Sequence, residues 1–459
     1  MVDRRNVVLA GGAALGSAMV GSAMLGATVL GSAALAGRAE AAAAAPRPKS
    51  PQFPPGFLWG AATAGHQVEG NDTASDLWLL ENLQPTAFAD KSGDACNSFE
   101  LWPQDLGLVR DLGLNSYRFS IEWSRIEPEP GQFSVAMLDH YQRMIEGCRE
   151  RGLTPVVTFN HFTAPRWFSA DGGWLNPASA GRFARYCERA ARHLAAGIGY
   201  ATTLNEPNLL HLLKSMDLPA PLLEAQRAML AAAARVTGTA QFSAANVTNV
   251  EDLGRQQVGL LAAHAAGRAA IKGVRPDLPV GVSLAVQDDQ VVGKDPEVRD
   301  RKRAECYGAW LEATKQDDFV GVQNYERAVY DAKGRVAPPA DVPRNSMGSE
   351  IYPPSLGGAV RYVHGATGRP ILVTEHGLGS ADDAQRAAFI PPALAGLKAA
   401  IDEGIPVRGY IHWSLIDNFE WIFGYGPKYG LYAVDRQSFR RTAKPSAAVY
   451  GAIARRNAL

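Results

Sequence analysis

Three consecutive segments decide the fold that we expect for this chain: the stretch Ile371-Leu372-Val373-Thr374, the helical pattern Asp382 to Glu403 and the stretch Val407 to Trp413. Both short runs are mainly apolar, as buried parallel strands are. The segment between them is long enough for a helix, and its acidic first residues suit a helix N-terminus. A strand, a helix and a strand in this order predict one βαβ unit of a parallel sheet.

The same alternation continues along most of the chain. Helical patterns at Val135 to Arg151, Ala178 to Ala195 and Gln256 to Gly273 lie between further short apolar runs. Eight such units predict an α/β fold, a single-domain (β/α)₈ TIM barrel. The competing fold is a doubly wound open sheet, which normally carries a ligand loop after its first strand. The eight expected strands are Phe57 to Ala62, Ser116 to Ser120, Pro155 to Phe159, Tyr200 to Leu204, Val280 to Leu284, Phe319 to Val322, Ile371 to Thr374 and Val407 to Trp413.

Two longer segments interrupt the alternation. Leu209 to Val250 contains an alanine-rich helical stretch, Leu222 to Arg235, and we expect it to cover one rim of the site. Arg327 to Pro354 contains five prolines, which predicts an extended loop.

Polar side chains follow most of the expected strands, at the end where barrel enzymes carry their catalytic groups. Glu206 lies in Thr203-Leu204-Asn205-Glu206-Pro207, and Glu375 lies in Thr374-Glu375-His376-Gly377. A single glutamate at a strand end is more often a surface or ion-paired residue. A pair suggests cleavage of a glycosidic bond, which needs an acid for the departing oxygen and a carboxylate for the carbon. Amides, carboxylates and indoles nearby suit a sugar. The strand-end residues are Gln67, Glu69, Arg118, Asn160, His161, Asn205, Glu206, Asn324, Tyr325, Glu375, Trp413, Glu420 and Trp421.

Four motifs in this order resemble the β-glucosidases of glycoside hydrolase family 1. They are Phe57 to Thr63 continuing through Gln67-Val68-Glu69-Gly70, then Tyr117 to Ile126, Thr203 to Pro207 and His412 to Trp421. The resemblance extends from about Phe53 to Tyr450. It implies a (β/α)₈ barrel that hydrolyses β-glycosides with retention of configuration.

The resemblance also implies a role for each site residue. Glu206 would be the acid/base and Glu375 the nucleophile, with their carboxyl groups ~5 to 5.5 Å apart. Arg118 would favour the ionised form of Glu375, and Tyr325 would donate its hydroxyl to the same carboxylate. Asn205 would bind the sugar 2-hydroxyl. The residues that match the glycone-binding set of the family are Gln67, His161, Trp413, Glu420 and Trp421.

Some positions separate subclasses or depart from the family pattern. Glu420 favours a neutral sugar, because a fixed negative charge repels phosphate, although Lys428 nearby leaves a phosphorylated sugar open. His376 stands where the family most often has asparagine, and its imidazole could alter the pKa of Glu375 or simply pack. Glu326 follows Tyr325 where a second tyrosine is common. The departures concentrate on the leaving-group side, so the sequence predicts the reaction better than the substrate.

Composition excludes several other classes of protein. The chain of 459 residues has 46 Lys and Arg against 46 Asp and Glu, so no net field favours nucleic acid or an anionic membrane. Its sequence contains no phosphate-binding glycine motif, C-x-x-C or H-E-x-x-H pattern, and we predict no cofactor and no metal. The expected partner is a small-molecule β-glycoside or oligosaccharide, and the oligomeric state stays open. Free buried thiols are expected at Cys96, Cys148, Cys187 and Cys306.

The N-terminal segment differs in kind from the rest. Arg4-Arg5 precede an uncharged, Gly/Ala/Ser-rich run from Val7 to Gly37, and small residues follow at Ala41 to Ala45. This pattern predicts a cleaved, twin-arginine-like export signal over residues 1 to 45, a Pro-rich linker over 46 to 55 and a glycosidase domain over 56 to 459. An uncleaved membrane anchor is the alternative. We expect an exported protein, periplasmic or extracellular, without stable membrane insertion once the signal is removed.

The sequence therefore predicts an exported retaining β-glycosidase, a β-glucosidase by preference, acting on terminal β-linked neutral sugars. A transglycosidase would use the same residues. The rival from another class is a secreted glycan-binding barrel without turnover.

Overall fold

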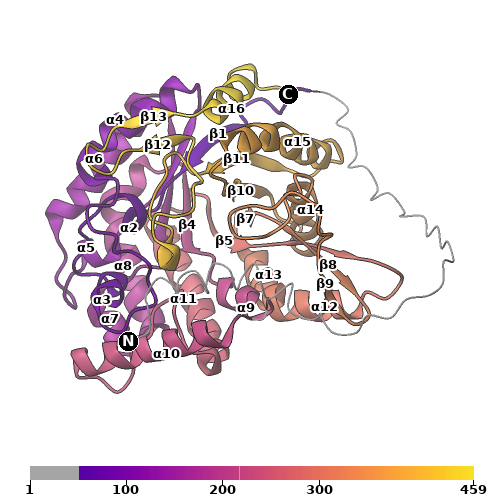
Figure 1. Ribbon diagram of the computed structural model, residues 1–459. Coiled ribbons are helices and arrows are strands. Elements are labelled where there is room, and N and C mark those ends of the chain that lie inside the picture. The colour runs from indigo at the N-terminus through magenta and orange to yellow at the C-terminus, as the bar shows by residue number, and fades with distance from the viewer. Residues whose placement is uncertain (1–50, 217) are drawn as a thin grey trace.

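A closed barrel of eight parallel strands forms the centre of the described chain (Figure 1). The computed structural model describes residues 51–216 and 218–459, so the predicted signal and the first half of the predicted linker lie outside the described residues. β1 pairs with β2 on one side and with β11 on the other, which confirms the (β/α)₈ barrel and excludes an open sheet. The barrel strands are β1 (Leu58–Ala62), β2 (Ser116–Ser120), β3 (Thr154–Asn160), β4 (Tyr200–Asn205), β5 (Val280–Ala285), β7 (Phe319–Asn324), β10 (Ile371–His376) and β11 (Val407–Trp413).

Helices cover the outside of the barrel, and the main apolar core lies between the two layers. The four expected helices are present as α6 (Val135–Glu150), α8 (Ser179–Leu194), α11 (Leu253–Val274) and α15 (Asp383–Asp402). The Asp382 carboxylate accepts a hydrogen bond from the Ala384 amide at 3.0 Å, so the acidic start caps α15 as predicted. The other helices of eight or more residues in the described chain are α4 (Ser98–Asp111), α10 (Ala220–Thr237), α14 (Ser355–Thr367) and α16 (Pro445–Arg456).

Five barrel strands extend past their expected ends, and β7 and β10 do so by two residues each. β7 ends at Asn324 and β10 at His376, whereas the sequence predicted ends at Val322 and Thr374. Glu375 and His376 are therefore strand residues. Because side chains alternate along a strand, these two neighbours point to opposite sides of the barrel wall.

The proline-bearing segment is not an extended loop throughout, so this expectation was wrong for its first part. β8 (Arg327–Asp331) and β9 (Gly334–Val336) form a small sheet with β6 (Asp288–Val291). Asp331 Oδ1 accepts from the amides of Lys333 and Gly334 and so builds the turn between β8 and β9. All five prolines follow β9, so they carry no information on the strands that precede them.

The segment after β4 contains α9 (Leu209–Lys214) and α10. Met229 and Leu230 of α10 share an apolar cluster with Leu77 of α3 (Asp76–Asn82) and with Phe419, and Trp421 packs against that cluster. The segment therefore supports one rim of the site, as expected.

The first and last parts of the described chain meet beside β1, where Figure 1 places the C-terminal helix α16. The Tyr450 hydroxyl donates to the Gly60 carbonyl at 2.7 Å, and the Leu459 amide donates to the Pro51 carbonyl at 3.0 Å. All four cysteines are buried free thiols, as predicted. Within residues 51–216 and 218–459, no helix has both the length and the apolar character needed to cross a membrane.

Candidate active site

Side chains from within β2 and from the end of β7 hold Glu375. Nη1 of Arg118 in β2 donates to Glu375 Oε1 at 2.5 Å, and both side chains are buried. The Tyr325 hydroxyl, which follows β7, donates to Glu375 Oε2 at 2.8 Å. Each carboxylate oxygen thus has its own donor, and the three residues lie together as the sequence predicted. The arrangement stabilises the ionised carboxylate and fixes its orientation.

Asn205 lies in the same network. Its Oδ1 accepts from Arg118 Nη2 at 2.6 Å and from Gln323 Nε2 at 2.8 Å. These two donors fix which end of the amide is the oxygen. Among the described residues no protein group accepts from Asn205 Nδ2, so this N–H group is free to donate.

Gln323 is a site residue that the sequence did not reveal. It is 1% exposed, it positions Asn205, and it lowers the pKa of Glu375 by hydrogen bonding. The available signal was a buried polar pair, Gln323-Asn324, at the end of an otherwise apolar strand. Asn324 itself bonds the Val286 carbonyl and Ser355 and so has a structural role.

Two other polar residues that the sequence predicted at strand ends serve the fold, and Glu69 in fact follows the short helix α2 (Gly65–Val68). Glu69 accepts from Arg125 Nε at 2.8 Å and from the Tyr141 hydroxyl. The Asn160 amide donates to the Thr163 carbonyl at 2.8 Å.

Glu206 follows β4 with a backbone φ of 42°, in the left-handed region that a non-glycine residue rarely adopts. Its amide donates to the Ser283 carbonyl at 2.8 Å, which holds this turn to β5. No protein group in the described chain donates to or accepts from its carboxyl group. A strained backbone and a free carboxyl group are typical of a residue placed for chemistry.

The two glutamates have unequal surroundings. Burial and the charge of Glu375 raise the pKa of Glu206 well above its usual value, and Arg118 opposes this effect. Burial also raises the pKa of Glu375, but Arg118, Tyr325 and Gln323 all lower it. A proton shared by the pair therefore resides on Glu206, and Glu375 keeps the negative charge.

Gln67 and Glu420 lie side by side. Gln67 Nε2 donates to the Phe419 carbonyl at 2.7 Å and lies 3.5 Å from Glu420 Oε2. Burial and the charge of Glu375 raise the pKa of Glu420 to about 8, against a lowering by Gln67. Lys428 donates to the Tyr425 carbonyl at 2.8 Å.

Aromatic rings line the same side of the site. His161 stacks on Trp413 with ring centroids 5.8 Å apart and on Trp421 with centroids 6.0 Å apart. Burial and the Arg118 charge lower the pKa of His161 well below its usual value, so its imidazole is neutral. The structure thus brings His161, Trp413 and Trp421 together as predicted.

His376 turns away from the two carboxylates. Its ring stacks on Phe389 of α15 with centroids 5.1 Å apart, and its Nδ1 lies 2.9 Å from the Tyr410 hydroxyl. Burial lowers its pKa to about 3, so it carries no charge that could act on Glu375. Of the two roles that the sequence left open, the structure shows packing.

Glu420→Gln is expected to stabilise the free protein while it impairs sugar binding. A carboxyl group with a pKa near 8 in the folded state and 4.5 in the unfolded state binds more protons when folded, so its contribution to stability falls as pH rises from 4.5 to 8. The variant removes that loss. Glu420 is partly exposed, so we expect a gain of roughly 1 kcal/mol in unfolding free energy at pH 8 and a smaller one at pH 5. Denaturant unfolding at the two pH values measures it, and a gain independent of pH would contradict the argument.

Comparison with known proteins agrees with this geometry. The family model for "Glycosyl hydrolase family 1" matches residues 49–320 and 322–459. A β-glucosidase of Agrobacterium sp. is 30% identical over 453 residues, covering 89% of this chain and 96% of that protein. A bifunctional β-D-glucosidase/β-D-fucosidase of Bifidobacterium breve is 31% identical, covering 86% of this chain and 96% of that protein. The crystal structure of a β-glycosidase, BGL167, superimposes with a TM-score of 0.83 at 48% identity, covering 89% of this chain and 98% of that one.

The chain belongs to glycosyl hydrolase family 1. It is a glycoside hydrolase with β-glycosidase activity, acting on the O-glycosyl bonds of small-molecule glycosides.

Proposed function

We propose that this protein is a retaining β-glucosidase that removes terminal β-linked neutral sugars through a covalent intermediate on Glu375. The observation that carries the proposal is the pair of unequal carboxyl groups. Glu375 is held ionised by Arg118 and Tyr325, whereas Glu206 is half-buried, has a pKa well above its usual value and has no partner for its carboxyl group among the described residues.

In the first step the Glu206 O–H donates its proton to the glycosidic oxygen, and a Glu375 oxygen bonds to the anomeric carbon as the bond to the leaving alcohol breaks. In the second step Glu206, now a carboxylate, takes a proton from water. The hydroxide oxygen bonds to the anomeric carbon, and the ester bond to Glu375 breaks. Two inversions give net retention. The Asn205 amide would bind the 2-hydroxyl, a contact that strengthens in the transition state.

A neutral sugar is favoured by the side of the site that holds Glu420. Its carboxyl group lies next to Gln67, with Oε2 3.5 Å from the amide nitrogen, and the negative charge of its ionised form would repel a phosphate there. The Lys428 ammonium is engaged at the Tyr425 carbonyl. The Agrobacterium relative is a β-glucosidase by name, and the Bifidobacterium relative acts on both β-D-glucosides and β-D-fucosides by name.

Trapping with an activated 2-deoxy-2-fluoro-β-glucoside tests the proposal. The fluorine removes the 2-hydroxyl contact and destabilises the cationic transition state of both steps, while the activated leaving group favours the first. We expect the intact mass to rise by one fluoroglucosyl group, located on Glu375 by peptide mapping. Glu375→Gln is the matched control and should show no adduct. A folded, sugar-binding protein without an adduct would favour the glycan-binding rival.

The same experiment separates hydrolysis from transfer. Adding a simple alcohol to the trapped protein measures how fast acceptors other than water release the sugar. Faster release by the alcohol than by water would favour a transglycosidase. A panel of aryl β-D-glycosides ranked by kcat/KM then tests the preference for glucose.

We also propose export by the twin-arginine route. Arg4-Arg5 and the weakly apolar run behind them support it, and a route that carries folded proteins suits a chain with four buried free thiols. Cell fractionation with N-terminal sequencing of the mature protein tests both location and cleavage.

A further inference from the structure

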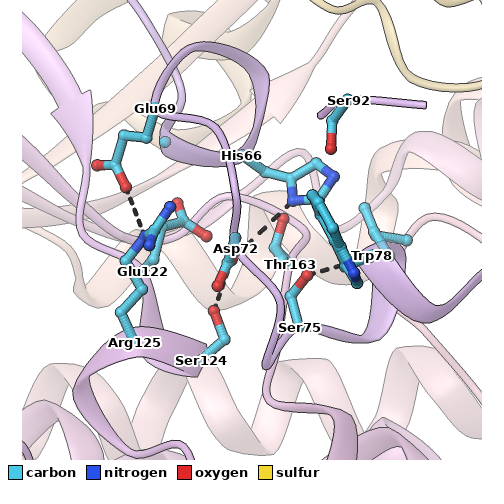
Figure 2. Close-up of polar contacts among 12 residues, drawn as sticks. His66, Glu69, Asp72, Ser75, Trp78, Ser92, Glu122, Ser124, Arg125 and Thr163 are labelled. Carbon is cyan, nitrogen blue, oxygen red and sulfur yellow. Dashed lines mark hydrogen bonds and ion pairs between the residues drawn. The ribbon is translucent and has the colours of Figure 1, made fainter. Parts of the chain in front are cut away.

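The residue before Gln67, His66, belongs to a buried cluster of charged side chains. Figure 2 shows its centre, where His66 faces Asp72 and where Glu69 meets Arg125. His66 belongs to the short helix α2 (Gly65–Val68) and is 1% exposed. None of these four side chains touches Glu206 or Glu375, and the mechanism above does not use them.

Carboxylates surround the His66 ring. Nδ1 lies 4.0 Å from Asp72 Oδ2, and Nε2 lies 3.5 Å from Glu81 Oε2. Both carboxylates are fixed by serines: Ser124 donates to Asp72 at 2.7 Å and Ser92 donates to Glu81 at 2.5 Å. The ring thus lies between two anchored carboxylates at ion-pair distances, without a hydrogen bond to either.

His66 is charged in this environment. Burial alone would lower its pKa, but Asp72 and Glu81 outweigh burial and raise the pKa to about 10. The other carboxyl groups of the cluster are either ion-paired or protonated. Glu69 pairs with Arg125, and burial together with Asp72 and Glu69 raises the pKa of Glu122 well above its usual value, so that it is protonated.

The charged ring lies against Trp421. The two ring planes differ by 3°, and their centroids are 6.0 Å apart, within the range of a cation–π contact. Trp421 needs such support, because it starts a one-turn 3₁₀-helix (Trp421–Phe423) with a backbone φ of 48°. Phe162 meets the same indole edge-on at 5.2 Å.

We propose that His66 is a positioning residue for the sugar site: its buried positive charge holds the indole of Trp421, and with it the adjacent Glu420, in the orientation that binds the sugar. This inference rests on the proposed sugar-binding role of Trp421. His66 touches no substrate and acts only through the indole. The segment that it holds is joined to the first strand region by the bond from Gln67 to the Phe419 carbonyl.

A comparison with the parent protein isolates the charge of His66. The parent carries the charged ring, and the double variant His66→Phe/Glu81→Gln keeps an aromatic ring but removes one positive and one negative charge together. Relative to the parent, we expect the double variant to raise KM for an aryl β-glucoside about tenfold, the size of a desolvated cation–π contact, with kcat within about threefold. Equal KM values would overturn the proposal.

A double-mutant cycle distinguishes positioning from general support of the fold. Adding Trp421→Ala to both proteins should abolish the KM difference, because the group through which His66 acts is gone. If His66 only stabilises the fold, its effect on KM will persist without the indole. The dissociation constant of a glucose-like inhibitor, measured by calorimetry for the same four proteins, gives the same comparison without turnover. The proposed function can therefore fail in the trapping experiment while the cycle still reports on His66.

The unmodified protein offers a second measurement if the double variant does not fold. Nitrogen-15 NMR of the imidazole side chains at pH 8.5 should show a charged ring for His66, since it keeps its proton up to about pH 10. A spectrum in which every histidine is neutral at pH 8.5 would overturn the proposal.

Discussion

Glu375→Ala is expected to lower kcat/KM for an aryl β-glucoside by about 10⁵-fold, because no other group can bond to the anomeric carbon. The variant also leaves Arg118 without its carboxylate partner, so the fold should be checked by circular dichroism before kinetics are compared. Added azide fills the vacated space and should restore turnover of activated substrates with an α-glycosyl azide as product. Rescue that gives the β-azide would contradict the assignment of Glu375 as nucleophile.

The neighbouring His376 provides the matched control. His376→Phe keeps the ring that stacks on Phe389 and loses only the contact with the Tyr410 hydroxyl. We expect kcat/KM within about threefold of the parent and a loss of about 1 kcal/mol in stability. A large loss of activity would mean that His376 acts on the nucleophile after all.

Glu206→Gln is expected to lower kcat/KM by about 10³-fold for alkyl β-glucosides and disaccharides, whose leaving groups need a proton. Dinitrophenyl glucosides, which leave without protonation, should lose less than about tenfold in kcat/KM, since this parameter reports the first step. Steady-state kinetics on a series of leaving groups measures how strongly kcat/KM depends on the pKa of the leaving group. Equal losses across the series would refute the acid role.

Azide separates the two carboxyl groups in one experiment. In Glu206→Ala the glycosyl-Glu375 intermediate still forms from an activated substrate, and azide attacks it from the side that Glu206 has vacated. The product should be the β-glycosyl azide, opposite in configuration to that from Glu375→Ala. The same anomer from both variants would contradict the division of roles.

The barrel and the centre of the site could be predicted because their signals are local. Each strand is a short apolar run, and the polar residue that ends it faces the site by strand geometry alone. Glu206, Glu375 and Tyr325 lie at such strand ends, Arg118 lies inside β2, and their motifs resemble one family. The alternation of strand side chains also explains why His376, one residue from Glu375, lies outside the site.

The parts that escaped prediction depend on contacts between distant segments. Gln323 matters because it meets Asn205, 118 residues earlier, and nothing in its own strand indicates that partner. His66 is charged only because Asp72 and Glu81 converge on it after the chain folds around Trp421. The sheet of β6, β8 and β9 likewise joins segments on either side of β7. At each of these positions the local sequence shows only a polar or prolyl residue. Its role depends on contacts that form in the tertiary structure.

The closure of the barrel between β1 and β11 also has a consequence for synthesis on the ribosome. Arg118, Glu206 and Glu375 all emerge before β11, so an unfinished chain can contain both carboxylates and their cation. It lacks Phe419, whose carbonyl anchors Gln67 from 352 residues away, and Trp421, on which the sugar would rest. Its sheet also keeps two open edges, which attract other chains. Protection from aggregation and the ability to bind a sugar therefore both require that the last barrel strand and the loop after it have been synthesised.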